Sequence, residues 1–181
     1  SSGFDIISGL AKRAFACSNM LLVSSFFSFF GFFFLVDIDT VSSSAGGGML
    51  SKLNTQIDCQ EISEICIKNL LLMGFNVYQG NFNDIRFHMQ YDLVTCWHAL
   101  EHIKDLYGYA EKLASVSKDT CILEVPINRR LKEPNNGSWD GHYHFFTEKS
   151  ITHLFGEYFS DIQFSVTESI QQPALLVILK K

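Results

Sequence analysis

The sequence predicts an α/β fold, with a mostly parallel sheet and helices on both of its faces. Runs rich in β-forming residues alternate along the chain with stretches of helical periodicity. The run FFFLV at 32–36 is apolar throughout, which is typical of a strand buried on both faces of a parallel sheet. Only a short link separates two late strands, which predicts an antiparallel hairpin at one edge.

In chain order, we expect a helix over 9–25, strands over 32–38 and 55–60, a helix over 61–73, strands over 76–79 and 91–96, a helix over 105–116, a strand over 120–125, a helix after 147, and strands over 159–166 and 174–179. The helix over 61–73 is expected to bury Ile62, Ile65, Cys66, Asn69, Leu70 and Met73. Asp105 and Thr147 are N-cap candidates, and Gly74 stands where a helix C-cap would. The polar, turn-rich segment 128–141 is predicted to be a loop.

The length of 181 residues suits one domain, with a helical segment over 1–31 and the α/β core over 32–181. Hydrophobic residues make up 47% of the chain and charged residues 18%, which indicates a globular protein rather than a disordered one. The formal net charge is -5 and no basic cluster stands out. We therefore expect no nucleic-acid partner held by phosphate contacts.

The 5 cysteines are odd in number, and no pair has a close metal-ligand spacing. This favours free, mostly buried thiols in a reducing compartment, so we expect a cytoplasmic protein.

The stretch 14–36 carries no charge, follows Lys12 and Arg13, and precedes Asp37, which is also the layout of a membrane-spanning helix. We favour a helix followed by a buried strand, because the later motifs require a first strand that ends near Asp37 or Asp39. Membrane contact through 14–36 remains the alternative.

Ligands of open parallel sheets bind beyond the carboxyl ends of the strands, where the strand order reverses. After the first strand, Gly46, Gly47 and Gly48 would let the backbone approach a ligand, although three glycines are as often only a flexible turn. After the second strand, Glu61 has two oxygens that can accept both hydroxyls of a ribose. The alternatives are a solvent-facing glutamate favoured by the helix dipole, or Asp58 in the same role.

Two further segments follow the third and fourth strands. In the first, Asn83 and Asp84 could read an adenine amino group beside the ring of Phe82, or they could form an Asx-rich turn. In the second, the polar groups are His98, Glu101 and His102. These could perform acid–base chemistry or bind a metal, or they could simply fasten the following turn.

These residues stand in segments that resemble class I S-adenosylmethionine-dependent methyltransferases over about 32–181. YDLVTCWHALEHIKD is similar to their fourth strand and turn, and EISEICIKNLLLMGFNVYQGN to the end of the second strand, the helix and the third strand. GHYHFFTEKSITHLF resembles a segment of a subgroup often tied to ubiquinone-type or saccharide methylation. The resemblance implies a Rossmann-like sheet of seven strands in the order 3-2-1-4-5-7-6, with the seventh strand antiparallel. It also implies methyl transfer from S-adenosylmethionine to a small-molecule acceptor.

By this resemblance Glu61 binds the ribose, Asn83 and Asp84 lie on the adenine side, and Trp97 lies beside the methionine portion. An acceptor hydroxyl, giving O-methylation, would need a base, and the candidates are His98, His102, His142 and His144. Our main expectation is a site without metal. Some relatives place a Glu and a His of a similar turn on a divalent metal, and here these would be Glu101 and His102, with or without His98.

The first loop departs from the family pattern of an acidic residue followed by three spaced glycines. Asp39 precedes Glu61 by 61 − 39 = 22 residues, a spacing typical of the family's two acidic positions, and is a candidate cofactor contact. That register places Val41, Ser43 and Ala45 at the glycine positions, and the actual glycines come later, at 46–48. An alternative function is therefore that of a degenerate methyltransferase-fold protein acting as a non-catalytic binding module.

Overall fold

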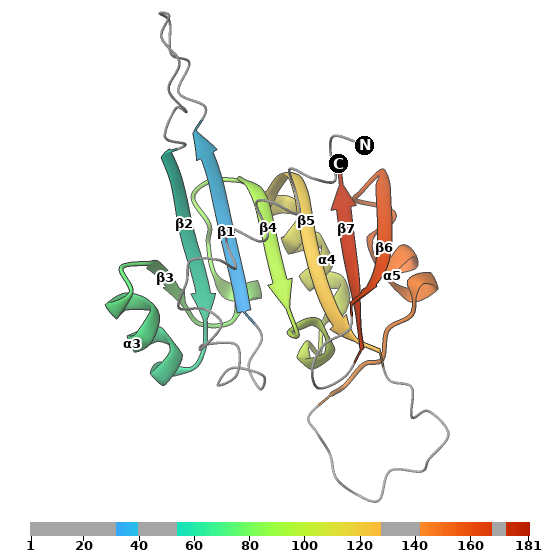
Figure 1. Ribbon diagram of the computed structural model, residues 1–181, viewed down its shortest axis with the longest axis horizontal. Coiled ribbons are helices and arrows are strands. Elements are labelled where there is room, and N and C mark those ends of the chain that lie inside the picture. Colours follow the sequence, from blue (N-terminus) through green and yellow to red (C-terminus); the bar gives the residue numbers. More distant parts are fainter. Residues whose placement is uncertain (1–31, 40–53, 128–141, 168–172) are drawn as a thin grey trace, which may run out of the picture. The chain divides into compact units, whose positions relative to one another are not determined.

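The computed structural model describes residues 32–39, 54–127, 142–167 and 173–181. The elements, labelled as in Figure 1, are β1 Phe32–Asp39, β2 Asn54–Glu61, α3 Glu64–Leu72, β3 Asn76–Gln79, the 3-10 turn η1 Phe82–Asp84, β4 Tyr91–Trp97, the 3-10 turn η2 Leu100–His102, α4 Leu106–Val116, β5 Ser117–Pro126, α5 Glu148–Phe155, β6 Asp161–Thr167 and β7 Ala174–Lys180. Each predicted element within these ranges is present. The predicted helix over 9–25, the loop over 128–141 and Gly46, Gly47 and Gly48 lie outside them.

The strands form one seven-stranded sheet in the order β3-β2-β1-β4-β5-β7-β6 (Figure 1). The pairs β2–β3 and β4–β5 are parallel, whereas β1 is antiparallel to both of its neighbours. The predicted late hairpin is confirmed, because β7 pairs antiparallel with both β5 and β6.

The direction of β1 corrects the expectation of a mostly parallel sheet. Four of the six neighbouring pairs among these strands are antiparallel. The apolar run at 32–36 predicts a buried strand but carries no information about the direction of that strand. An antiparallel neighbour can also be reached without the crossover helix that a parallel neighbour needs.

Strands β2, β3, β4 and β5 nevertheless run in one direction, because β1 opposes both β2 and β4. The carboxyl ends of these four strands lie on the same side of the sheet (Figure 1). This side, which runs across the ends of the strands, is here called the carboxyl edge, and the opposite side is called the far edge. The arrow of β1 points the opposite way, so β1 begins at the carboxyl edge and ends at the far edge.

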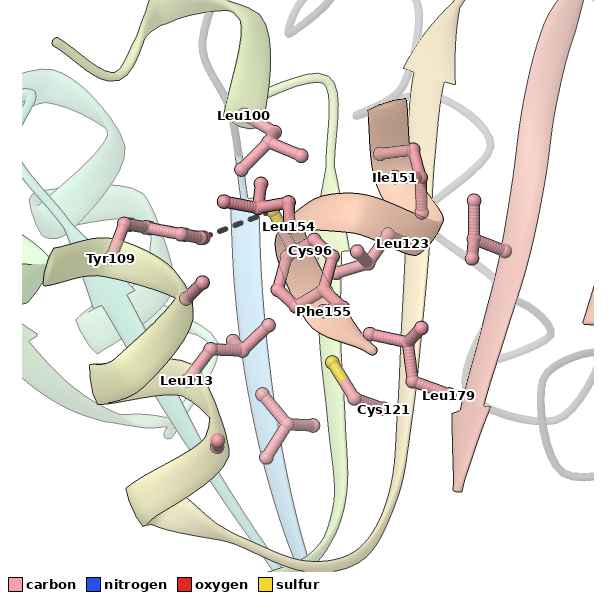
Figure 2. Packing of buried hydrophobic residues seen from close by; sticks show 14 of the residues in the cluster. Cys96, Leu100, Tyr109, Leu113, Cys121, Leu123, Ile151, Leu154, Phe155 and Leu179 are labelled. Atoms are coloured by element: carbon pink, nitrogen blue, oxygen red, sulfur yellow. Dashed lines mark hydrogen bonds between the residues drawn. The ribbon is translucent and has the colours of Figure 1, made fainter. Parts of the chain in front are cut away.

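Helices α4 and α5 pack together with β4, β5 and β7 to form the main core (Figure 2). The core residues shown there include Leu113 of α4, Leu154 and Phe155 of α5, and Cys96, Leu123 and Leu179 of the strands. Tyr109 of α4 places its hydroxyl 3.2 Å from the sulfur of Cys96. The prediction of buried thiols is confirmed for the cysteines that the structure describes: Cys59, Cys66, Cys96 and Cys121 are free and buried.

The predicted helix ends are confirmed. The Asp105 carboxylate accepts a hydrogen bond from the N–H of Gly108 at 3.0 Å, and Thr147 forms a capping box with Ser150. Gly74 follows α3 with φ of +86°, the left-handed conformation that favours glycine at helix ends.

The buried face of α3 differs from the predicted one. Cys66, Ile67 and Leu70 are buried, whereas Ile62 and Ile65 are 63% and 73% exposed. Apolar residues occupy most of the circumference of this helix, so periodicity alone could not select the face that packs.

No helix within the described ranges is long and apolar enough to cross a membrane. Residues 32–36 of the uncharged stretch belong to β1, which confirms the strand interpretation of that part. Residues 14–31 lie outside the ranges that the structure describes.

Candidate functional site

The backbones of Glu61 and Trp97 stand at the same level of the carboxyl edge, on either side of β1. Phe32 pairs with Trp97, and Phe33 pairs with Gln60, so the same register places Phe32 opposite Glu61. Because neighbouring strands are spaced by 4.7–4.9 Å, the two backbones are about 10 Å apart. The structure thus brings the predicted ribose and methionine positions together at one edge.

The Glu61 carboxylate is 1% exposed and is held by the start of α3. Its Oε1 accepts hydrogen bonds from the N–H groups of Ile62 at 2.7 Å and Ser63 at 2.8 Å. Its Oε2 is buried and has no hydrogen-bond partner within the described ranges. Burial raises the pKa of Glu61, and the two backbone hydrogen bonds oppose this shift. A buried acceptor without a donor costs about 1–3 kcal/mol, so Oε2 is suited to meet a ligand hydroxyl.

Asp58, the rival carboxylate, is committed to the fold. Its Oδ2 accepts a hydrogen bond from the Tyr91 hydroxyl at 2.7 Å, and its Oδ1 accepts one from the Asn76 amide at 3.1 Å. Both oxygens of Asp58 already have donors, whereas Glu61 Oε2 has none within the described ranges, so Glu61 is the better candidate for a ligand contact.

The turn after β3 lies beside Glu61. The N–H of Gly80 donates to the backbone oxygen of Glu61 at 3.0 Å, and the Asn81 side chain accepts from the N–H of Asn83 at 3.2 Å. The Asx-turn interpretation is therefore confirmed. Asp84 is exposed, and Asn83 carries a buried Oδ1 that no group in the described ranges satisfies. Asn83 thus keeps acceptor capacity in the turn whose first residue, Gly80, contacts Glu61.

Phe82 does not fit its predicted place beside an adenine ring. It is 2% exposed, and its ring centroid lies 5.3 Å from that of Phe87 and 5.1 Å from that of Tyr109. The ring therefore belongs to the main core cluster.

We expect Gly80→Ala to destabilise the protein by about 1–3 kcal/mol, because φ of +118° lies outside the range that side-chain-bearing residues adopt. A β-carbon at Gly80 meets nothing within 4 Å, so the effect would be purely conformational. Urea unfolding followed by circular dichroism measures it. An unchanged midpoint would show that this turn relaxes freely.

Asp39, a predicted cofactor contact, lies at the far edge of the sheet. It pairs with Asn54 at the start of β2, seven residues before Glu61. At about 3.3 Å per residue, this separates the backbones of Asp39 and Glu61 by about 23 Å. The reversal of β1 is the reason, because it carries the end of that strand away from the carboxyl edge.

The turn after β4 is fastened to the segment that precedes α5. Glu101 is 1% exposed, and its backbone oxygen accepts from the N–H groups of Tyr143 at 2.8 Å and His144 at 3.3 Å. These contacts join the turn to a segment much later in the chain, which the sequence did not predict. The same contacts bring His142 and His144, predicted only as acid–base candidates, to the turn that carries Glu101 and His102.

Glu101, His102 and His142 form a compact group, in which one ligand atom from each lies within 4.8 Å of the others. The rings of His102 and His142 meet edge to face, with centroids 4.7 Å apart. Glu101 Oε2 and His144 Nε2 are buried and have no hydrogen-bond partner in the described part of the chain. One carboxylate and two imidazoles are a ligand set that first-row divalent metals accept.

His98 stands between two carboxylates. Its Nε2 is 3.0 Å from Glu124 Oε1, and its Nδ1 is 3.5 Å from Glu101 Oε1. Hydrogen bonds to Glu101 and then Glu124 raise the pKa of His98 to about 9, against the opposing effect of burial. Both ring nitrogens of His98 already face carboxylate oxygens, which favour the protonated ring, so the geometry supports His98 less than the other histidines as a general base.

We expect the stabilising effect of His98 to depend on pH. The folded pKa of about 9 lies above the ordinary value of 6.5, so the effect is complete below pH 6.5 and is lost as the pH rises through 9. Urea unfolding of the wild type and of His98→Asn, each in EDTA, should therefore give a stability difference that shrinks between pH 7 and 10. A difference that is constant over this range would contradict the ion pairs.

Sequence reasoning did not single out Glu124. It lies in β5, where its side chain contacts His98 and also accepts a hydrogen bond from Thr167 of β6 at 3.2 Å. The available signal was one charged residue in the otherwise apolar run CILEV.

The sheet order is the one that the resemblance to class I methyltransferases implies, although β1 runs in the opposite direction. A family model described as a methyltransferase domain matches residues 25–158, which is more than half of the chain. The chain belongs to this family. A search of curated proteins finds no match.

Solved structures share the fold at low sequence identity. Magnesium protoporphyrin IX methyltransferase from Synechocystis PCC 6803, with bound SAH, is 14% identical with a TM-score of 0.50, and the match covers 67% of this chain and 62% of that one. The methyltransferase domain of bacterial CtHen1-CN is 16% identical with a TM-score of 0.51, over 67% and 76% of the two chains. The N-methyltransferase NodS from Bradyrhizobium japonicum WM9 is 10% identical with a TM-score of 0.50, over 67% and 71%. The chain therefore spans less than two thirds of the length of the porphyrin methyltransferase.

Proposed function

We propose that this domain binds S-adenosylmethionine at the carboxyl edge and transfers its methyl group to a hydroxyl of a small-molecule acceptor. The observation that carries the proposal is Glu61: one oxygen is fixed by the start of α3, and the other is buried without a donor. A ribose hydroxyl would supply that donor. Trp97 stands at the same level of the edge, on the far side of β1.

In this proposal Glu61 accepts from the ribose, Asn83 and Asp84 face the adenine, and Trp97 borders the methionine portion. The unpaired Asn83 Oδ1 supports the adenine side, because it can accept from an exocyclic amino group. Asp39 has no part in the proposal, because it lies at the far edge.

Bound S-adenosylmethionine supplies an electrophilic methyl group on its sulfonium. The chain's own task is to align the acceptor oxygen with that methyl, to exclude water and to receive the hydroxyl proton. His102, His142 and His144 are the proposed proton acceptors. His144 is supported by its buried Nε2, which has no partner within the described ranges.

The neighbouring structures do not fix the acceptor atom, because their names include a porphyrin methyltransferase and an N-methyltransferase. A hydroxyl is favoured here by the imidazoles grouped beside the turn after β4, since a neutral hydroxyl must lose a proton when it is methylated.

We further propose that Glu101, His102 and His142 hold a divalent cation, and with that cation bound the proton acceptor is His144, which lies outside this group. Two features fit it: the ligand atoms lie within 4.8 Å of one another, and Glu101 Oε2 is buried without a donor. A cation at these residues would lower the pKa of an acceptor hydroxyl. Mn²⁺ titration of EDTA-treated protein, followed by electron paramagnetic resonance, tests this. One saturable site is expected, and the absence of any saturable site removes the cation from the proposal.

The second candidate function, a non-catalytic binding module, is favoured by one observation. The end of β1, which precedes the atypical first loop, lies at the edge opposite Glu61. Calorimetry of the full chain with S-adenosylhomocysteine separates the two candidates. Saturable heat at micromolar ligand supports the methyltransferase, whereas no heat at high micromolar ligand supports the binding module and overturns the first proposal.

A further inference from the structure

A continuous series of side-chain contacts leads from β6 to the turn after β4. The Thr167 hydroxyl donates to Glu124 Oε2 at 3.2 Å. Glu124 Oε1 lies 3.0 Å from His98 Nε2, and His98 Nδ1 lies 3.5 Å from Glu101 Oε1. The series ends at Glu101, whose second oxygen, Oε2, is buried and unpaired within the described ranges. Only one oxygen of Glu101 is therefore used by this series.

The backbone conformation of His98 is a second, independent indication that its surroundings hold this residue in a fixed conformation. Its φ is +48°, and it is the only non-glycine residue with positive φ in the part of the chain that the structure describes. Its N–H donates to the backbone oxygen of Glu124 at 2.9 Å. A residue keeps this conformation when its surroundings over-determine it, and such residues cluster at functional sites. Here the surroundings are the two carboxylates on either side of the ring.

We infer that His98 is a positioning residue that fixes Glu101 through Oε1, so that Oε2 is the oxygen presented to a ligand. This rests on the proposed function, because Oε2 belongs to the group proposed to hold a cation. Glu124 acts one step further away by orienting the His98 ring. Neither residue touches the ligand, and outer partners of this kind typically change metal affinity by about 10- to 100-fold.

A purely structural alternative is that His98 and Glu124 only join the ends of β4 and β5. The pair Asp92 and Lys118 offers a matched comparison, because it joins the same two strands by an ion pair of 3.4 Å at the far edge of the sheet. If the His98–Glu124 pair only joined β4 to β5, its loss would affect Mn²⁺ binding no more than the loss of the Asp92–Lys118 pair.

The first test measures Mn²⁺ affinity of the full chain by electron paramagnetic resonance. We expect His98→Asn and Glu124→Ala each to weaken binding by about 10- to 100-fold. Asparagine tolerates the positive φ of this position. Glu124→Gln should restore most of the affinity, because its amide oxygen still accepts from His98. Asp92→Asn should leave Mn²⁺ affinity unchanged, and all four variants should keep the wild-type affinity for S-adenosylhomocysteine.

The second test needs no ligand and is a double-mutant cycle on urea unfolding in EDTA. Glu101→Ala and Glu124→Ala, which each remove the contact with His98, are made singly and together in the wild-type and His98→Asn backgrounds. When His98 is present, we expect the effect of the double substitution on the unfolding equilibrium constant to differ by at least about twofold from the product of the two single effects. The coupling should vanish in the His98→Asn background, because Glu101 and Glu124 are linked through that ring.

Unchanged Mn²⁺ affinity in His98→Asn, or additive effects in the cycle, overturns the inference. If the wild type binds no Mn²⁺, the cation proposal fails, and the cycle alone decides the role of His98. If S-adenosylhomocysteine fails to bind, the methyltransferase proposal fails independently of both tests.

Discussion

Replacing Glu61 with Gln is expected to weaken S-adenosylhomocysteine binding by about 10- to 100-fold, because hydrogen bonds to a charged group contribute about 1.5–3 kcal/mol. The amide oxygen of Gln can still accept from the N–H groups of Ile62 and Ser63, as Oε1 does now. Its amide nitrogen would take the place of Oε2 and would offer a donor where the ribose also offers one. The loss would therefore come from the ligand contact and not from the start of α3.

Isothermal titration calorimetry measures this effect, and circular dichroism checks the fold. Glu64→Gln is the matched control, because Glu64 lies in the first turn of α3 and is exposed. Its affinity should equal that of the wild type. Equal affinity in the Glu61→Gln protein as well would remove Glu61 from the cofactor site.

Glu101→Gln is expected to weaken Mn²⁺ binding by more than about 100-fold, beyond the range typical of outer partners. The substitution keeps the side-chain volume and the Oε1 acceptor that faces His98 Nδ1. It replaces the unpaired Oε2 with an amide nitrogen, which carries protons and cannot ligate a cation. The effect should be confined to the cation, with cofactor affinity unchanged.

Electron paramagnetic resonance of Mn²⁺ provides the measurement, with Glu111→Gln on the exposed side of α4 as the control. His142→Ala should give a similar loss, because it removes another of the three proposed ligands. Wild-type affinity in both the Glu101→Gln and His142→Ala proteins would place any Mn²⁺ site elsewhere.

Local sequence signals predicted the elements of this protein well. The caps at Asp105 and Thr147 and the glycine after α3 depend on contacts within a few residues, and all three are confirmed. The strands were recognisable because turn residues separate one run of β-forming residues from the next. Glu61 was singled out by its position directly after a predicted strand, and its role in ribose binding is the proposal made above.

Features that depend on strand direction or on contacts between residues far apart in the sequence could not be predicted from these local signals. The buried face of α3 is selected by β2 and β3, and the apolar residues around that helix allow several choices. The role of His98 depends on Glu124, which is 26 residues away in the sequence. Without that partner, a histidine after a buried strand is indistinguishable from a general base.

The sequence by itself determined where the strands and helices lie and which polar residues follow the strands, because these depend on composition, periodicity and short-range contacts. Only the tertiary structure decided that β1 runs against its neighbours, which removed Asp39 from the site. It also decided that His142 joins Glu101 and His102. The physical reason is that strand direction and side-chain grouping are set by hydrogen bonds between residues far apart in the chain, such as those from Tyr143 and His144 to Glu101.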